Sequence, residues 1–378
     1  MKSRTMREVI CVFLLLSSFM YCSQPKQVEN TVYVNFDRPE KASLSDYFHT
    51  VELIPLETNA DVLMQYVARM VCHQNRFYIL DKTQSIIFVF DEKGNFIYKI
   101  DNKGQGPGQY IFIQDIYFNP FSGHLELLTP MGIIYDYDLS GNYLETRKVV
   151  YDDFHAVHHL IAIDSATRVF YSMFEPKKII YYNLVEEKLL HDEFEEDSDI
   201  GSYAWDNFFQ SKDSWYFFRP FHTVVYKIGE KKLEPAYRFD FGKFKREGLT
   251  VNFPQEPARG VQAGRDRAFT QYPYWIQMIG HNVNYIFMQL LWQKDENYVN
   301  IVYDKSTGTG KFIPKFEEDV LFVPNIVTDE YVLSWFMWID LEKYIPQSLL
   351  DDSSKKIYKL LLESEMETNP VLIKYYFK

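Results

Sequence analysis

A strand-rich unit repeats along this chain about every 45 residues, and this period limits the possible folds more than any other feature. The clearest copy spans residues 76–110, RFYILDKTQSIIFVFDEKGNFIYKIDNKGQGPGQY. Two runs rich in aromatic and β-branched residues, 77–81 and 86–90, predict a hairpin. The turn at 94–95 then leads into a third run, 96–100. Three antiparallel strands in so compact a unit predict most of one β-propeller blade.

Other copies of this unit follow along the chain. They begin near residues 124, 168 and 214, a fifth begins at Asn284, and a sixth, degraded copy holds the runs 320–323 and 331–336. The longer gap from Phe244 to Gly280 contains several prolines and glycines, which predicts an inserted loop. Aromatic residues make up 17% of the chain, and they suit pleated, half-buried strands. We therefore predict an all-β fold, a six-bladed β-propeller over residues 31–378.

The two ends of the chain are expected to meet in one blade. Residues 341–365 change to a helical pattern, which predicts a short C-terminal helical insertion before a closing strand at 371–377. Near the other end, residues 31–36 and 51–56 have the pattern of early strands. An open ring would leave two unpaired sheet edges. We therefore expect the N-terminal strands and the last strand to complete the same blade.

The first 21 residues have the pattern of a signal peptide. A basic start that includes Lys2 and Arg7 precedes the apolar run 9–20, which is too short for a membrane span. Cys22 follows directly and resembles the acylated cysteine of bacterial lipoproteins, although Phe19-Met20-Tyr21 stands where small residues are usual. We predict lipidation at Cys22 and a tether over 22–30; cleavage at another position is the alternative. The predicted location is the bacterial cell envelope, on the periplasmic or outer-membrane face.

The charge of the chain restricts its partners. A formal net charge of −12 gives a field that repels nucleic acid and anionic membranes. We therefore expect no nucleic-acid partner, and contact with a membrane through the lipid anchor only. A partner protein, a carbohydrate or a peptide remains as the expected ligand.

Three segments resemble a known family. They are VELIPLET at 51–58, KGQGPGQY at 103–110 and NPVLIKYYFK at 369–378. Together they resemble the six-bladed β-propeller family of exported lipoproteins in Bacteroidetes-type bacteria, over a stretch from about Val51 to the end. That family is more distantly similar to NHL-repeat propellers, some of which are lyases or hydrolases with a metal in the central channel. A fold shared by binders, scaffolds and enzymes does not define the chemistry.

Histidines supply one candidate site. His155, His158 and His159 lie within five residues of one another, and imidazole is a common ligand of divalent metals. On a strand His155 and His159 would share a face, so these two are the candidate metal ligands; a hydrogen-bonded loop is the alternative. Otherwise we expect no cofactor. His222 and His281 lie near blade boundaries, where they could join a site in the channel.

Arginines supply a second candidate site. Arg259, Arg265 and Arg267 form a basic patch in the long loop before the fifth copy. A guanidinium group matches carboxylate, phosphate or sulfate, and long loops often carry function, so we predict ligand binding by these three residues. A solvated surface loop is the alternative. Several tryptophans, among them Trp215 and Trp292, could stack on sugar rings or pack between blades.

The sequence favours a binding module over an enzyme. The glycine-rich segment 103–109 is followed by a strand pattern, so it predicts a crossing between blades and not a phosphate-binding loop. No HExxH, CxxC or nucleophile-elbow pattern occurs in the chain. We predict that the ring binds a ligand or a partner protein through its loops or its channel. The alternatives are a metal-assisted lyase or hydrolase of the NHL type and a structural subunit of an envelope complex.

Overall fold

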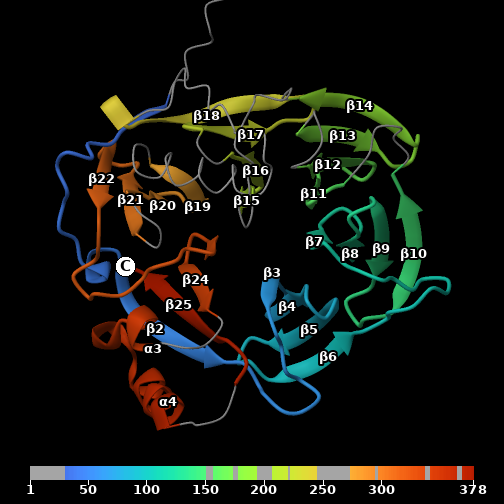
Figure 1. The fold of residues 1–378 in the computed structure, drawn as a ribbon, viewed down its shortest axis with the longest axis horizontal. Helices are drawn as coiled ribbons and strands as arrows, with labels where there is room; N and C mark the ends of the chain where they lie inside the picture. The colour runs from blue at the N-terminus through green and yellow to red at the C-terminus, as the bar shows by residue number, and fades with distance from the viewer. Residues whose placement is uncertain are drawn as a thin grey trace, which may run out of the picture.

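The structure, a computed structural model, describes nine segments of the chain. They are residues 30–149, 156–172, 178–193, 207–219, 222–244, 273–293, 297–336, 341–363 and 368–378, with only the backbone at 274–278. The described strands form six sheets arranged around one central axis (Figure 1). The six-bladed β-propeller that the repeat predicts is therefore confirmed.

Each blade has four antiparallel strands, and the first of them is innermost. Two variations occur: an N-terminal strand adds a fifth, parallel strand to blade 4, and the ring closes with strands from both ends of the chain. Blade 1 contains β3 (Val67–His73), β4 (Arg76–Asp81), β5 (Ile86–Asp91) and β6 (Phe96–Ile100). Blade 2 contains β7 (Asp115–Asn119), β8 (His124–Leu128), β9 (Ile133–Tyr137) and β10 (Tyr143–Lys148). Blade 3 contains β11 (His159–Ala162), β12 (Thr167–Tyr171), β13 (Ile179–Asn183) and β14 (Lys188–Glu193). Blade 4 contains β15 (Phe208–Ser211), β16 (Ser214–Phe217), β17 (Val224–Ile228) and β18 (Leu233–Asp240). Blade 5 contains β19 (Tyr274–His281), β20 (Tyr285–Leu291), β21 (Tyr298–Asp304) and β22 (Thr309–Ile313).

The sixth blade closes the ring with strands from both ends of the chain. It contains β23 (Ile326–Val327), β24 (Tyr331–Phe336), β25 (Val371–Phe377) and, outermost, β2 (Phe48–Pro55). In the antiparallel pair of β2 and β25, Val51 lies opposite Tyr375 and Leu53 lies opposite Ile373. The expected closure by the last strand and an N-terminal strand is confirmed.

The earliest strand does not join the closing blade, contrary to the prediction. β1 (Thr31–Tyr33) pairs in parallel with β18, at the outer edge of blade 4. Val32 and Phe36 are buried there in the cluster that also holds Phe239. Burial of these alternating apolar side chains explains why the segment covers an outer edge that would otherwise be exposed.

Helical structure lies mostly near the C-terminal end, as predicted. α3 (Leu341–Tyr344), η3 (Gln347–Leu349) and α4 (Asp352–Glu363) lie between β24 and β25, while η1 (Leu44–Asp46) and η2 (Gly242–Phe244) are short turns elsewhere. The Leu53 amide donates to the Ser354 hydroxyl at 2.9 Å, which fixes α4 beside β2. Within the described segments, every helix lacks the length and the apolar character needed to cross a bilayer.

The turns between third and fourth strands repeat in atomic detail. The carboxylate of Asp91 accepts from the amide of Asn95 at 2.9 Å, and that of Asp138 accepts from the amide of Asn142 at 2.9 Å. Gly94 occupies the left-handed region, with φ of 85°, where a side chain would be strained. This shared turn chemistry is the local reason for the period of the sequence.

The glycine-rich segment 103–109 connects the outer strand of blade 1 to the inner strand of blade 2, as predicted. β7 begins only at Asp115, later than the strand pattern at 110–116 indicates. The intervening residues are anchored by Tyr110, whose buried hydroxyl donates to the Ile100 carbonyl at 3.1 Å. Burial of Tyr110 and Ile113 explains why this stretch has a strand-like composition without being a strand.

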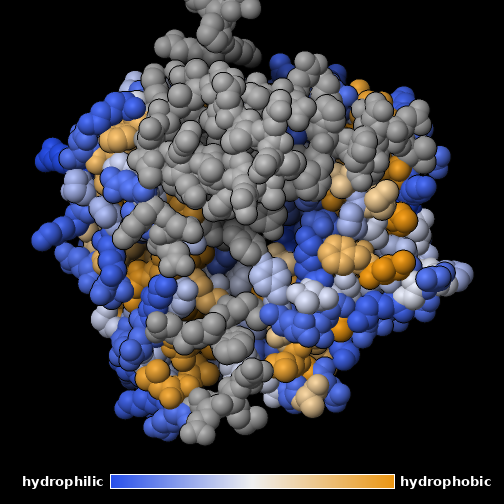
Figure 2. All heavy atoms as spheres, viewed as in Figure 1, coloured by the Kyte–Doolittle hydropathy of each residue, from blue (hydrophilic) through white to orange (hydrophobic). Residues whose placement is uncertain are grey.

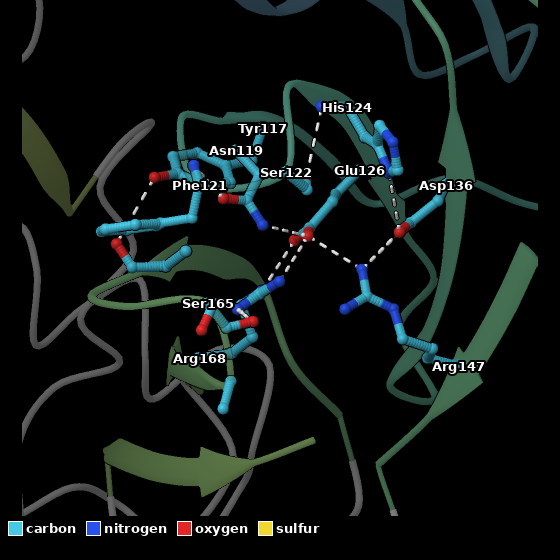
Figure 3. Close-up of polar contacts among 12 residues, drawn as sticks. Tyr117, Asn119, Phe121, Ser122, His124, Glu126, Asp136, Arg147, Ser165 and Arg168 are labelled. Atoms are coloured by element: carbon cyan, nitrogen blue, oxygen red, sulfur yellow. Dashed lines mark hydrogen bonds and ion pairs between the residues drawn. The ribbon is translucent and has the colours of Figure 1, made fainter. Parts of the chain in front are cut away.

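A buried ion network joins blades 2 and 3 (Figure 3). Glu126 on β8 and Arg168 on β12 are both fully buried, and Arg168 donates to the two carboxylate oxygens at 2.7 and 2.9 Å. Arg147 on β10 approaches from another side and donates to Glu126 at 2.9 Å and to Asp136 at 2.6 Å. The side-chain amide of Asn119 donates a further hydrogen bond to Glu126 at 2.7 Å. Burial opposes ionisation, yet Arg168 and its neighbours hold the pKa of Glu126 below its ordinary value.

Candidate functional site

The inner strands surround a cavity of about 990 Å³ at the centre of the ring. Residues of β3, β7, β15, β19 and β23 line it, and Figure 2 shows the surface hollowed near the middle of the ring. Aromatic side chains are frequent in the lining, including those of Tyr66, Tyr117, Phe118, Phe209, Trp215 and Trp335. Concave sites of this size with many aromatic faces are typical of small-molecule binding.

The cavity has a cationic excess in an acidic protein. Among its described lining residues, Arg69, Lys212 and Lys343 are cationic, and Asp329 is the acidic one. The whole chain carries a formal net charge of −12. A local field of this sign attracts an anionic ligand and opposes the field of the outer surface. The sequence alone did not indicate these residues, because they come from four segments that the ring brings together.

A buried carboxylate lies beside Arg69, one of the residues that line the cavity. Asp115, at the start of β7, lies 3.4 Å from Nε of Arg69 on β3 and 3.4 Å from Nδ1 of His159 on β11. It also accepts from the amide of Leu160 at 3.1 Å. Burial opposes ionisation of Asp115, yet Arg69 and His159 hold its pKa below the ordinary value. The carboxylate therefore stays ionised and ties together the inner strands of three blades.

The structure describes one of the two candidate metal ligands, His159, and not the other. His159 is buried, contacts Asp115 and stacks on the ring of Tyr171, and burial lowers its pKa. His155 lies outside the described residues. Across the described segments, no group of three or more His, Cys, Asp or Glu side chains converges as a metal site would require. Metal binding by His155 and His159 stays a prediction.

The structure describes only some of the other predicted functional residues. Arg259, Arg265, Arg267 and Cys22 lie outside the described residues. His281 lies at the end of β19 and lines the cavity, as its place at a blade boundary predicted.

The two tryptophans lie in different places, and stacking on sugar rings stays a prediction. Trp215 lines the cavity, where its ring centroid lies 5.6 Å from that of Tyr117. Trp292 instead packs 4.8 Å from Phe36, between β1 and blade 5.

The repeat offers one way to locate cavity residues that the sequence analysis did not identify. The inner strand of each blade precedes the hairpin pattern from which the copies are recognised, as β3 precedes the run at 77–81. Counting each blade from that earlier strand places Arg69 in an inner strand, whereas Lys212 follows β15 and Lys343 lies in α3. Residue type alone does not distinguish Arg69 from an ordinary strand residue.

Comparison with known proteins supports the fold and identifies the family. A candidate exported protein of Bacteroides fragilis NCTC 9343 has a similar structure, with a TM-score of 0.71 and 17% sequence identity; the match covers 92% of this chain and 100% of that one. A member of the DUF4221 family from Bacteroides vulgatus ATCC 8482 is similar with a TM-score of 0.53 and 12% identity, covering 87% and 98%. No curated protein matches the chain. Residues 29–376 match the family described as domain of unknown function DUF4934, and the chain therefore belongs to that family.

Proposed function

We propose that this chain is an exported binding protein whose central cavity takes an anionic ligand built on rings, such as an acidic oligosaccharide. The cationic excess of the cavity in an otherwise acidic protein carries this proposal. Lys212 and Lys343 match carboxylate or sulfate groups, and Trp215 and Trp335 offer flat faces for sugar rings. Arg69 adds little net charge, because it is paired with Asp115. A cavity of about 990 Å³ has room for a few sugar units.

Two features support export. The first 21 residues have the pattern of a signal peptide, and a structural relative is described as a candidate exported protein. We propose that Cys22 carries a lipid that tethers the ring to the cell envelope. Mass spectrometry of the mature N-terminus tests this, because an unmodified Cys22, or a chain that begins elsewhere, would contradict it.

The long loop before β19 extends the proposal. Residues 245–272 connect η2 to β19, whose opposite end lines the cavity. Arg259, Arg265 and Arg267 belong to this connection. Because a guanidinium group matches carboxylate and sulfate, we propose that they add contacts to the same anionic ligand.

The experiment that tests the function is calorimetric titration with matched ligands. Trigalacturonate, a sulfated trisaccharide and an acidic tripeptide are each compared with neutral galactotriose at 50 and 300 mM NaCl. We expect an acidic saccharide to bind, galactotriose to bind at least about tenfold more weakly, and added salt to reduce the difference. Preference for the tripeptide would change the ligand class. Equal affinity for acidic and neutral sugars, or no binding of any, would refute the proposal.

Two pairs of lysine substitutions, one in the cavity and one outside it, test the role of the cavity charge. The double substitution Lys212→Met and Lys343→Met removes two cations from the cavity. The matched substitution Lys231→Met and Lys232→Met removes two cations from an exposed outer turn between β17 and β18. We expect the first pair to weaken binding of the acidic saccharide about tenfold or more and the second pair to change it less than about twofold.

A further inference from the structure

His281 is held in one orientation at the end of β19. Its Nδ1 lies 3.0 Å from Nζ of Lys305, which follows β21 in the same blade. The amine of Lys305 donates, so Nδ1 accepts and the ring proton stays on Nε2. The hydrogen bond thus selects one tautomer of the imidazole.

Aromatic rings of blade 4 complete the enclosure. The ring centroid of His281 lies 4.5 Å from that of Tyr216, 5.5 Å from that of Phe209 and 5.6 Å from that of Tyr237. The His281 residue is only 4% exposed. The imidazole is therefore wedged between two blades and cannot rotate without displacing three rings.

The other nitrogen of this ring lacks a partner. Nε2 of His281 is buried and has no hydrogen-bond acceptor among the described residues. A buried donor without an acceptor is destabilising, so native proteins rarely retain one without a use. Because His281 also lines the central cavity, a bound ligand can supply the missing acceptor.

The ring remains neutral through the physiological range. Burial, and then the charge of Lys305, lower the pKa of His281 to about 3, while the backbone of Asn282 opposes the shift. The amine of Lys305 also donates to the carbonyl of Asn282, so this carbonyl is shared with the amine. Burial lowers the pKa of Lys305 to about 8, with Asp329 opposing and Lys212 adding to the shift. Above pH 5 His281 is therefore a neutral donor, and the cationic charge near it comes from Lys305 and Lys212.

We propose that an oxyanion of the ligand, a carboxylate or a sulfate, accepts a hydrogen bond from Nε2 of His281, and that Lys305 is the positioning residue that fixes the donating tautomer. This inference rests on the proposed function, because it names the subsite that the anionic group of the ligand occupies. Lys212 and Lys305 supply the favourable field, against the single carboxylate of Asp329.

Nitrogen-15 NMR of the whole protein tests the subsite directly. We expect His281 to show the Nε2-protonated tautomer at pH 7, unchanged between pH 5 and 7, where Lys305 keeps its charge. Acetate, sulfate and trigalacturonate should each shift its Nε2 resonance saturably, while galactotriose should not. The Nδ1-protonated tautomer, or no saturable shift with any of the three anions, would overturn the inference. If calorimetry shows that trigalacturonate binds while the His281 resonance stays unmoved, the inference fails and the proposed function survives.

Variants separate this role from a structural one. His281→Phe keeps a ring among the three aromatic neighbours and removes both nitrogens, so we expect about tenfold weaker binding of trigalacturonate. Lys305→Met should mix the tautomers in the NMR spectrum and weaken binding about threefold. His191→Phe, on the outer strand β14 with a side chain 42% exposed, is the matched control and should leave binding within about twofold. Unchanged affinity in His281→Phe, or a tautomer unmoved by Lys305→Met, would contradict the assignment.

Discussion

Replacing Arg168 by methionine is the sharpest test of how the blades are held together. The substitution keeps a long side chain but removes the guanidinium that donates two hydrogen bonds to Glu126 at 2.7 and 2.9 Å. Glu126 is fully buried, so water cannot replace the lost donors. Breaking a buried ion pair by removing one partner costs about 3–5 kcal/mol. Two charge-assisted hydrogen bonds at about 1.5–3 kcal/mol each give a similar loss.

The pH dependence of this loss has a definite sign. In the native protein the pKa of Glu126 lies below the ordinary value of 4.5, so its stabilisation is present above that value and is lost as the pH falls through the folded pKa. Without Arg168 the buried carboxylate is poorly compensated and its folded pKa rises. We therefore expect the free-energy difference between the two proteins to be largest at pH 7.5 and to shrink toward pH 4.5.

Urea unfolding at pH 7.5 and pH 5, followed by tryptophan fluorescence, measures both effects. The double substitution Arg168→Met and Glu126→Gln removes one charge of each sign and leaves Arg147 paired with Asp136 at 2.6 Å. We expect the double variant to recover about half of the loss, because no buried charge is left uncompensated. A loss below about 1 kcal/mol in Arg168→Met, or a double variant as unstable as the single one, would refute the reasoning.

Two further predictions concern a turn and a thiol. Gly94 and Gly123 both have positive φ, but a Cβ on Gly94 would lie 2.3 Å from the carbonyl oxygen of Pro55 on β2, whereas one on Gly123 meets nothing within 4 Å. Gly123→Ala should cost about 1–2 kcal/mol and Gly94→Ala clearly more, measured as melting temperature; equal losses would contradict the contact between blades 1 and 6. Burial raises the pKa of Cys72 from 9.0 to about 12, so at pH 8 its thiolate should be roughly a thousandfold scarcer than in the unfolded chain. Although Cys72 is only half-buried and lines the cavity, alkylation of its peptide, followed by mass spectrometry, should be at least about a hundredfold slower in native protein. Similar rates would show that the pKa of the thiol is not raised.

The sequence predicted those parts of the fold that local chemistry specifies. Each blade is built from neighbouring strands and tight turns, so the turn at Asp91 and its copy at Asp138 leave a readable period. Ring closure by β2 and β25 followed from the cost of unpaired edges. The position of β1 did not follow, because its parallel pairing depends on contacts such as that of Asn30 with Ala236, 206 residues away. A parallel edge pairing of this kind has no local turn or spacing to reveal it.

The candidate site was harder to predict for a related reason. Asp115 meets Arg69 and His159 only because three inner strands converge, and each residue alone fits an ordinary strand. His281 was noted as a channel histidine, but Lys305, which orients it, lies beyond a whole hairpin. The arginines of the long loop attract attention in the sequence, whereas the cations of the cavity are scattered singly along the chain.

The pairing of the N-terminal strands also limits the order in which the molecule can fold. β1 and β2 leave the ribosome, and any export channel, before the strands of blades 1 to 5, yet β1 pairs with β18 in blade 4 and β2 pairs with β25 near the other end of the chain. Pairings so distant in sequence form slowly, because a long loop must close before its contacts form. The ring therefore closes only after its last strand, Val371–Phe377, is available. A chain that stops short of this strand is left with an unpaired β2 and an incomplete sixth blade, so full-length synthesis is a condition for a closed cavity.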